Sequence, residues 1–304
     1  MTSTIKIGRR QAHLSVVDES PPIVTTQGFP IPAVACFSGA GSPGRSTIAV
    51  NLASEFALAG QRVLLVDLDT LAPSISLQLG LTDTPAGLSA LLRLVEQNRL
   101  SRTEFSRLTV RVDLGRNELI FIPGLSSAVR WPEVSMERVS GLLEAVKSQF
   151  DLVVFDLSQP VHTRSKLQHP SLAMEDRDAL LAGVLEASSK IVFISGSDPI
   201  AAKRFIDAKG FLSDTASKAE QFVVVNRFRT AALGPSAKNE LEQTYERLLS
   251  LRIDCFIPDE PENFDRSIRN GLPLALLKRS SPARAELRQL ANQILLSSAK
   301  AQSG

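Results

Sequence analysis

Short apolar runs recur along the chain between longer stretches with helical spacing, and this alternation restricts the available folds more than any other feature. The runs are continuously apolar, which is typical of strands covered by helices on both faces. They occupy residues 33–37, 63–67, 119–123, 152–156, 191–195, 222–226 and 253–258. Helical spacing is clearest over 46–60, 135–150 and 285–299. The pattern predicts an α/β fold with a doubly wound, mostly parallel sheet of about seven or eight strands flanked by helices.

The polar N-terminal region differs from the rest of the chain. Residues 1–30 end in a proline-punctuated run and predict a flexible leader, whereas residues 31–300 predict a single domain. With 43% hydrophobic and 22% charged residues, the composition is typical of a globular protein with a sizeable core. The formal net charge of +2 is too small to indicate nucleic-acid or membrane binding by itself.

Several features predict a cytoplasmic protein. No apolar stretch reaches the length of about 18 residues that a membrane span needs, so we expect no integral membrane segment. The N-terminus lacks the layout of a signal peptide. Cys36 and Cys255 lie within apolar runs, which favours buried thiols over a disulfide or a metal site. Peripheral recruitment to the inner face of a membrane stays open.

A glycine-rich segment, GAGSPGRST, joins the first apolar run to the following helical stretch. It matches the phosphate-binding pattern G-x-x-x-x-G-K-[ST], except that arginine replaces lysine. Glycines let backbone N–H groups turn towards phosphate oxygens, and the start of a helix adds a favourable dipole. On the loop alone, an ordinary strand-to-helix turn that binds nothing stays open. The residues concerned are Gly39, Gly41, Gly44, Arg45, Ser46 and Thr47.

Polar residues close three of the other apolar runs. Asp67 and Asp69 follow the second run, Asp156 ends the fourth, and Asn226 and Arg227 follow the sixth. Ligands bind at the carboxyl ends of the strands in such sheets, so we expect these residues to share one site. We expect Asp67 and Asp69 to be exposed charges at the ligand edge. Asp156 stands where a phosphate-loop NTPase carries its Mg²⁺-linked aspartate.

Longer segments of the chain resemble the MinD/ParA family of P-loop ATPases with a deviant Walker A motif. The family's Walker A region and following strand are similar to SGAGSPGRSTIAVNLASEFALAGQRVLLVDLDTLAPSISLQLGL. Its Walker B strand is similar to DLVVFD, and the strand with its base-contacting asparagine to VVVNRF. Its last strand and following turn are similar to IPDEPENFDRSIRNGLPL. The resemblance covers residues 33–297 in the family's order.

This resemblance implies ATP and Mg²⁺ as cofactors. It implies that Asp69 positions the attacking water, with Arg45 as a second catalytic residue, and that Asn226 recognises adenine. Mg²⁺ would be supported by Ser46, Asp67 and Asp156. The nucleotide contacts would come from Gly39, Gly41, Gly44, Arg45, Ser46, Thr47, Asn226, Arg227 and Pro258.

Two positions depart from the family's pattern. Ala40 replaces the signature lysine, which reaches the partner's phosphates in a sandwich dimer, so the usual homodimer mechanism is in doubt. Arg45 keeps the positive charge but replaces a compact ammonium with a planar fork of donors. Loss of one transition-state contact commonly lowers a rate by a factor of about 100–1,000, whereas the backbone cradle can still bind the ground state. We therefore predict binding of ATP and ADP with slow hydrolysis.

The loop sequence SPGRST is most similar to that of the CpaE/TadZ-type proteins of Tad pilus assembly. This implies a spatial positioning or assembly factor whose partners are membrane-associated or pilus machinery proteins. Two alternatives stay open. A ParA-like partition ATPase would bind DNA through residues 264–304, where seven Lys and Arg residues stand against two acidic ones. A pseudo-ATPase scaffold would keep the fold without hydrolysis.

The remaining candidate residues favour ordinary structural roles. His162 and His169 fit no common zinc spacing, which indicates a solvated loop. Trp131 predicts packing against the following helix. A solvated face is expected for Arg99, Arg102, Arg107, Arg111 and Arg116. A terminal helix docked on the sheet is expected from Leu287, Leu290, Ile294 and Leu295.

Overall fold

A computed structural model of the chain describes residues 28–84, 87–161, 172–215, 217–230, 234–277 and 280–302. The strands are β1 (Ala33–Ser38), β2 (Val63–Leu68), β3 (Val110–Asp113), β4 (Glu118–Ile122), β5 (Leu152–Leu157), β6 (Lys190–Gly196), β7 (Glu220–Phe228) and β8 (Cys255–Pro258). The helices before β6 are α1 (Arg45–Leu58), α2 (Ile75–Gln78), α3 (Gly87–Glu96), α4 (Arg102–Leu108), the 3₁₀ helix η1 (Ala128–Glu133), α5 (Met136–Val146) and α6 (Leu172–Ala187). Those after β6 are α7 (Pro199–Asp214), α9 (Ala237–Leu249), α10 (Pro261–Asn270), α11 (Leu274–Leu277) and α12 (Pro282–Gln302).

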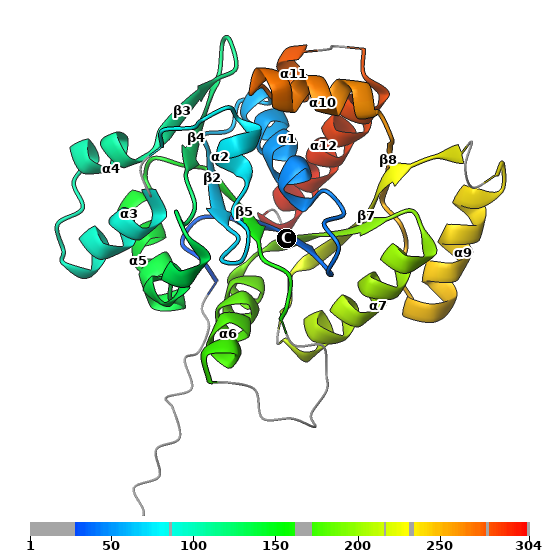
Figure 1. Cartoon of the computed structure of the whole chain (residues 1–304), viewed down its shortest axis with the longest axis horizontal. Helices are drawn as coiled ribbons and strands as arrows, with labels where there is room; N and C mark the ends of the chain where they lie inside the picture. The colour runs from blue at the N-terminus through cyan, green and yellow to red at the C-terminus, as the bar shows by residue number, and fades with distance from the viewer. Residues whose placement is uncertain are drawn as a thin grey trace, which may run out of the picture.

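The strands form one eight-stranded sheet in the order β3-β4-β2-β5-β1-β6-β7-β8. Every neighbouring pair is parallel except β3 and β4, which are antiparallel. Each of the seven apolar runs overlaps one of the other strands. Strand β3 has no continuous apolar run, because it lies at the edge of the sheet and exposes alternate residues, so the sequence pattern did not predict it. The doubly wound, mostly parallel sheet flanked by helices is therefore confirmed (Figure 1).

Two hydrophobic layers cover opposite faces of the sheet. Successive residues of β1 point to opposite sides, so Val34 and Cys36 pack with the layer under α1 and α12. Ala35 and Phe37 pack with the layer under α5, α6 and α7. Figure 1 shows these two groups of helices on either side of the sheet. Both faces of the central strands are buried, which explains their continuous apolarity.

The carboxyl end of β1 lies where the direction of winding reverses. From β1 the chain moves past β5 to β2, whereas from β5 it crosses past β1 to β6. In open α/β sheets this reversal creates a crevice at the strand ends. Asp156 of β5 is in register with Asp67 of β2 and with Cys36 of β1. The topology therefore brings the ends of β1, β2 and β5 together.

Helix α12 docks on α1 and β8, as its apolar stripe predicts. Leu287, Leu290 and Ile294 are each 1% exposed, and Leu295 packs beside them. At the start of the helix, Arg284 Nε donates to Glu55 Oε1 of α1 over 2.7 Å. One of the basic residues of the C-terminal segment is thus used inside the fold. Within the ranges given above, no helix is both long and apolar enough to cross a membrane.

The sequence also predicted the surroundings of the two cysteines, of Trp131 and of a group of arginines. Both cysteines are buried free thiols, as expected. The ring of Trp131 packs on the core, and the Arg177 guanidinium from α6 lies 4.9 Å from its centroid. The arginines between residues 99 and 116 are exposed, as expected. Residues 1–27 of the expected leader, together with His162 and His169, lie outside the described residues.

The Arg284–Glu55 pair generates a test of how α12 is held. Arg284→Gln should lower the free energy of unfolding by about 3 kcal/mol, because it leaves a buried carboxylate without its cation. The Glu55 side chain is only 4% exposed. Urea denaturation at pH 7 measures the loss, with Arg288→Gln at an exposed position of the same helix as the control. Equal effects of the two substitutions would contradict this account.

Candidate functional site

The loop between β1 and α1 uses left-handed backbone at two of its glycines. Gly41 and Gly44 have φ values of +94° and +91°, which L-residues rarely adopt. A Cβ at Gly44 would also overlap the side-chain amide of Asn226. Among the described residues no side chain caps α1, and its first turn holds no acidic residue. The backbone N–H groups at the start of α1 therefore remain available to an anion.

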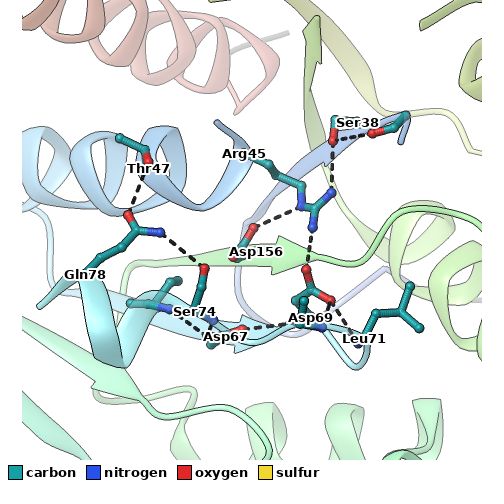
Figure 2. Close-up of polar contacts among 12 residues, drawn as sticks. Ser38, Arg45, Thr47, Asp67, Asp69, Leu71, Ser74, Gln78 and Asp156 are labelled. Atoms are coloured by element: carbon teal, nitrogen blue, oxygen red, sulfur yellow. Dashed lines mark hydrogen bonds and ion pairs between the residues drawn. The ribbon is translucent and has the colours of Figure 1, made fainter. Parts of the chain in front are cut away.

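The side chain of Arg45 lies behind this loop, among the strand ends. Its Nε donates to Asp156 Oδ1 over 3.2 Å, and its Nη2 donates to Asp69 Oδ2 over 2.5 Å. Its Nη1 donates to Ser38 Oγ over 2.9 Å. Figure 2 shows the guanidinium pointing at the two carboxylates, which come from β5 and from the turn after β2. The loop arginine is thus held by side chains at the ends of three strands.

Asp67 and Asp69 are buried, which corrects the expectation that they are exposed charges. Their relative exposures are 1% and 4%. The turn over residues 69–75 folds back over β2, and its backbone N–H groups take the place of water. Asp67 accepts three of these N–H groups over 3.1–3.2 Å, and Asp69 Oδ1 accepts two over 2.9 Å. Hydrogen bonds from local backbone allow these carboxylates to be buried.

Asp156 is the most deeply buried of the three aspartates. It is 0% exposed, and its Oδ2 has no hydrogen-bond partner within the described part of the chain. Burial raises the pKa of Asp156 to about 6, although Arg45 and the Ser46 hydroxyl both act to lower it. Burial also raises the pKa of Asp67 well above its ordinary value, and the nearby Asp156 charge adds to this rise. Asp156 Oδ2 is therefore available to bind a second cation besides Arg45.

The oxygen atoms at the strand ends fit a hard cation whose remaining ligands are water and phosphate. Among the described residues Asp156 Oδ2 has no hydrogen-bond partner, and the Ser46 hydroxyl acts on the same carboxyl group, whereas both oxygens of Asp67 already accept backbone N–H groups. In the described ranges no group of three or more His, Cys, Asp or Glu residues is arranged to hold a metal. Mg²⁺ suits such a site, because it is usually held by one or two protein oxygens together with water and phosphate.

A cleft of about 480 Å³ opens on the other side of the loop. Its loop wall carries no charged side chain and consists of Gly39, Ala40, Gly41, Pro43, Gly44 and Thr47. Its opposite wall comes from the ends of β6 and β7 and from α7 and α10. There the Nδ2 of Asn226 donates to the Pro43 carbonyl over 2.7 Å, whereas the buried Oδ1 has no partner among the described residues. The cleft thus offers backbone at one wall and a free amide acceptor at the other.

The predicted site residues form two groups, one that lines the cleft and one that does not. Six of them line the cleft: Gly39, Gly41, Gly44, Thr47, Asn226 and Arg227. Those outside the cleft lining are Arg45, Ser46, Asp67, Asp69, Asp156 and Pro258. Pro258 ends β8, and it is the next residue, Asp259, that reaches the cleft. Arg204 and Arg229 also line the cleft and were missed. Arg229 follows the asparagine strand closely enough to be found, whereas Arg204 lies inside a helix without a motif.

Comparison with known proteins places these features in a family. The family model described as the CobQ/CobB/MinD/ParA nucleotide binding domain matches residues 34–274. The septum site-determining protein MinD of Bacillus subtilis is 21% identical over 263 residues, which cover 86% of this chain and 88% of that protein.

Solved structures of low identity share the fold. A ParA family ATPase from Chlorobium tepidum has a TM-score of 0.67 at 17% identity, covering 86% of this chain and 98% of its own. MinD from Pyrococcus horikoshii, complexed with Mg-ADP, has a TM-score of 0.63 at 16% identity, covering 87% and 96%. Because the family model matches most of the sequence, the chain belongs to the CobQ/CobB/MinD/ParA nucleotide-binding domain family.

Proposed function

We propose that this chain binds ATP and ADP with Mg²⁺, hydrolyses ATP slowly, and acts as a nucleotide-dependent positioning or assembly factor. The observation that carries the proposal is the glycine loop, whose uncapped helix start opens on a cleft while Ser46 and Asp156 lie behind it. Backbone N–H groups of the loop would hold phosphates, and the helix dipole would favour their charge.

Asn226 supports the assignment of the base. Its Oδ1 is a buried acceptor at the cleft with no partner in the described part of the chain, and the exocyclic amino group of adenine is a donor. An adenine in this position would satisfy an oxygen that otherwise stays without a hydrogen bond. Arg227 adds a positive charge to the same wall.

Ser46 and Asp156 are the residues that would hold Mg²⁺, with Asp67 supporting them from the adjacent strand. The metal would neutralise charge on the β- and γ-phosphates when bound. The protein's contribution is the orientation of Asp156: strands β1 and β2 flank β5, and Arg45 holds one carboxylate oxygen while the other has no partner among the described residues. A relative complexed with Mg-ADP supports this choice of cofactor.

Slow hydrolysis follows from the position of Arg45. Asp69 is the residue proposed to orient the attacking water. Its Oδ2 accepts a hydrogen bond from Arg45, and its Oδ1 accepts from two backbone N–H groups. Its oxygens are therefore engaged before water arrives. We propose that Arg45 acts in catalysis by controlling when Asp69 is free, and that this control lowers the turnover rate.

The biological role extends the proposal beyond the family. The names of the relatives include a septum site-determining protein and a ParA family ATPase. On the basis of the loop sequence SPGRST we propose the CpaE/TadZ-type role. In this role a cytoplasmic chain is recruited to membrane-associated pilus machinery, and a homodimer is one of its states. An ATP-dependent, salt-sensitive shift of DNA mobility would favour the partition alternative instead. Absence of both heat and thermal shift with ATP would leave the pseudo-ATPase scaffold.

Asp69→Asn tests the proposed turnover. It should lower phosphate release from Mg-ATP at least about tenfold, because an amide cannot accept a proton from the attacking water. ATP affinity measured by calorimetry should change little, since Asp69 does not line the cleft. Asp207→Asn on the exposed side of α7 is the control and should leave both values unchanged. Equal phosphate release by wild type and Asp69→Asn would remove the enzymatic proposal.

Arg45→Lys tests the restraint on Asp69. A lysine ammonium cannot bind Ser38, Asp69 and Asp156 with the geometry of a planar fork, so Asp69 should be released. We expect phosphate release to rise about tenfold or more, in line with the usual effect of one transition-state contact. Arg45→Met also releases Asp69, but it leaves the site without the positive charge that stabilises the transition state, so phosphate release should not rise. An unchanged or lower rate for Arg45→Lys would show that the arginine does not restrain turnover.

The buried charge of Asp156 predicts a pH dependence in protein free of nucleotide and Mg²⁺. Because the folded-state pKa of Asp156 is raised from 3.8 to about 6, its stabilising contribution is present at low pH and lost as the pH rises through 6. Relative to Asp156→Asn, wild type should lose about 1–3 kcal/mol of unfolding free energy between pH 4.5 and 7.5. Urea denaturation with chelator present measures this difference.

Asp151→Asn provides a control of opposite sign. Hydrogen bonds from Arg62 lower the pKa of Asp151, so the stabilisation from Asp151 is present at neutral pH and lost in acid. Relative to Asp151→Asn, wild type should therefore gain stability as the pH rises. A difference between wild type and Asp156→Asn that stays constant with pH would contradict the role of the buried carboxylate.

A further inference from the structure

The loop wall of the cleft holds no cation of its own. Arg45 is turned towards the carboxylates on the far side, and Ala40 contributes a methyl group where the family has its signature lysine. Nucleotide phosphates carry several negative charges, and proteins commonly meet them with arginine or lysine as well as backbone N–H groups. If phosphates occupy this cleft, their cationic partner must come from another element.

Helix α7 brings Arg204 directly against the loop. The Arg204 carbonyl oxygen lies so close to Gly39 that a Cβ there would overlap it. The Arg204 guanidinium lies over Gly41, where a Cβ would overlap Nη1. The absence of side chains at these two glycines thus allows a helix and a guanidinium to approach the phosphate loop. Figure 1 shows α7 beside the loop that leads into α1.

Arg204 belongs to a helix that is packed firmly on the sheet. The next residue, Phe205, is 1% exposed and stacks on Phe193 of β6 with 3.8 Å between ring centroids. This packing holds the helix against the sheet. In the part of the chain that the structure describes, the Arg204 guanidinium makes no hydrogen bond or ion pair. Its neighbour Lys203 instead pairs with Asp207 on the exposed side of α7.

The other arginines of the cleft are less suited to bind phosphate. Arg229 pairs with Asp259, with 3.6 Å between Nε and Oδ2. The backbone of Arg227 is left-handed, with φ of 54°, and its carbonyl accepts from Ser197 Oγ over 2.9 Å. Neither is placed over the glycines of the loop by a contact like that of Arg204. Among the described residues, Arg204 is therefore the guanidinium that lies over the phosphate loop without a hydrogen bond or ion pair of its own.

We propose that Arg204 binds the phosphates of the nucleotide, supplying from the same chain the charge that Ala40 does not supply from a partner chain. This inference rests on the proposed nucleotide binding. A guanidinium presents donors in a fixed fork that matches two oxygens of a phosphate. Because loop and guanidinium belong to one chain, nucleotide affinity should not require self-association.

Calorimetric titration with ATP and with adenosine tests this role. Arg204→Gln should weaken ATP binding about 10- to 100-fold, the effect of losing a charge-assisted hydrogen bond, while adenosine affinity stays within about twofold. Arg204→Lys should retain part of the ATP affinity. Lys203→Gln removes the same charge one residue away, outside the cleft lining, and should change neither ligand. Thermal stabilisation by tripolyphosphate should be present in wild type and lost in Arg204→Gln.

The outcomes separate this inference from the function on which it rests. Failure of wild type to bind ATP at all would overturn the proposed function and this inference together. Wild-type binding with unchanged ATP affinity in Arg204→Gln would overturn the inference alone. Equal losses for ATP and adenosine in that variant would show a structural role and would also overturn it. So would an ATP affinity of wild type that falls on dilution of the protein, because the missing charge would then come from a partner.

Discussion

The ion-pair network of Arg45 with Asp69 and Asp156 is the interaction on which the site depends. Three carboxylates meet at the carboxyl ends of β2 and β5, and desolvated carboxylates require hydrogen bonds or a cation. The turn after β2 supplies backbone N–H groups, and Arg45 supplies the cation. The same guanidinium reaches Ser38 at the end of β1. One side chain from the start of α1 thus links the ends of three strands behind the loop.

This position of Arg45 separates the site into two compartments. The loop wall of the cleft offers backbone and no charged side chain, whereas Arg45 and the buried carboxylates lie behind the loop. For Arg45 to reach a phosphate, its guanidinium must leave Asp69 and Asp156, and that exchange leaves buried carboxylates without a cation. A divalent metal at Asp156 would offset this loss. Binding of metal and release of Arg45 would therefore be electrostatically coupled, and this coupling would make turnover slower than binding.

Patterns in the sequence predicted the fold more completely than the site. Continuous apolar runs report burial on both faces, so seven strands were found, whereas the alternating edge strand β3 gave no such signal. The burial of Asp67 and Asp69 was predicted wrongly, because hydrogen bonds from the turn over 69–75 depend on a backbone path that residue types do not specify. Arg204 was missed for a related reason: its importance comes from a helix approaching two glycines far away in the sequence.

The source of the positive charge determines what nucleotide binding can control. A lysine that crosses to a partner makes phosphate binding and self-association one event, because each stabilises the other. The guanidinium of Arg204 is carried by a helix that Phe205 packs on the sheet of the same chain, so an interaction with phosphate would be independent of any second copy. With Ala40 and Arg204 in this arrangement, a change in self-association on nucleotide binding would have to arise from movement of the loop or of α7. Coupling would then run through the packing of α7 on β6.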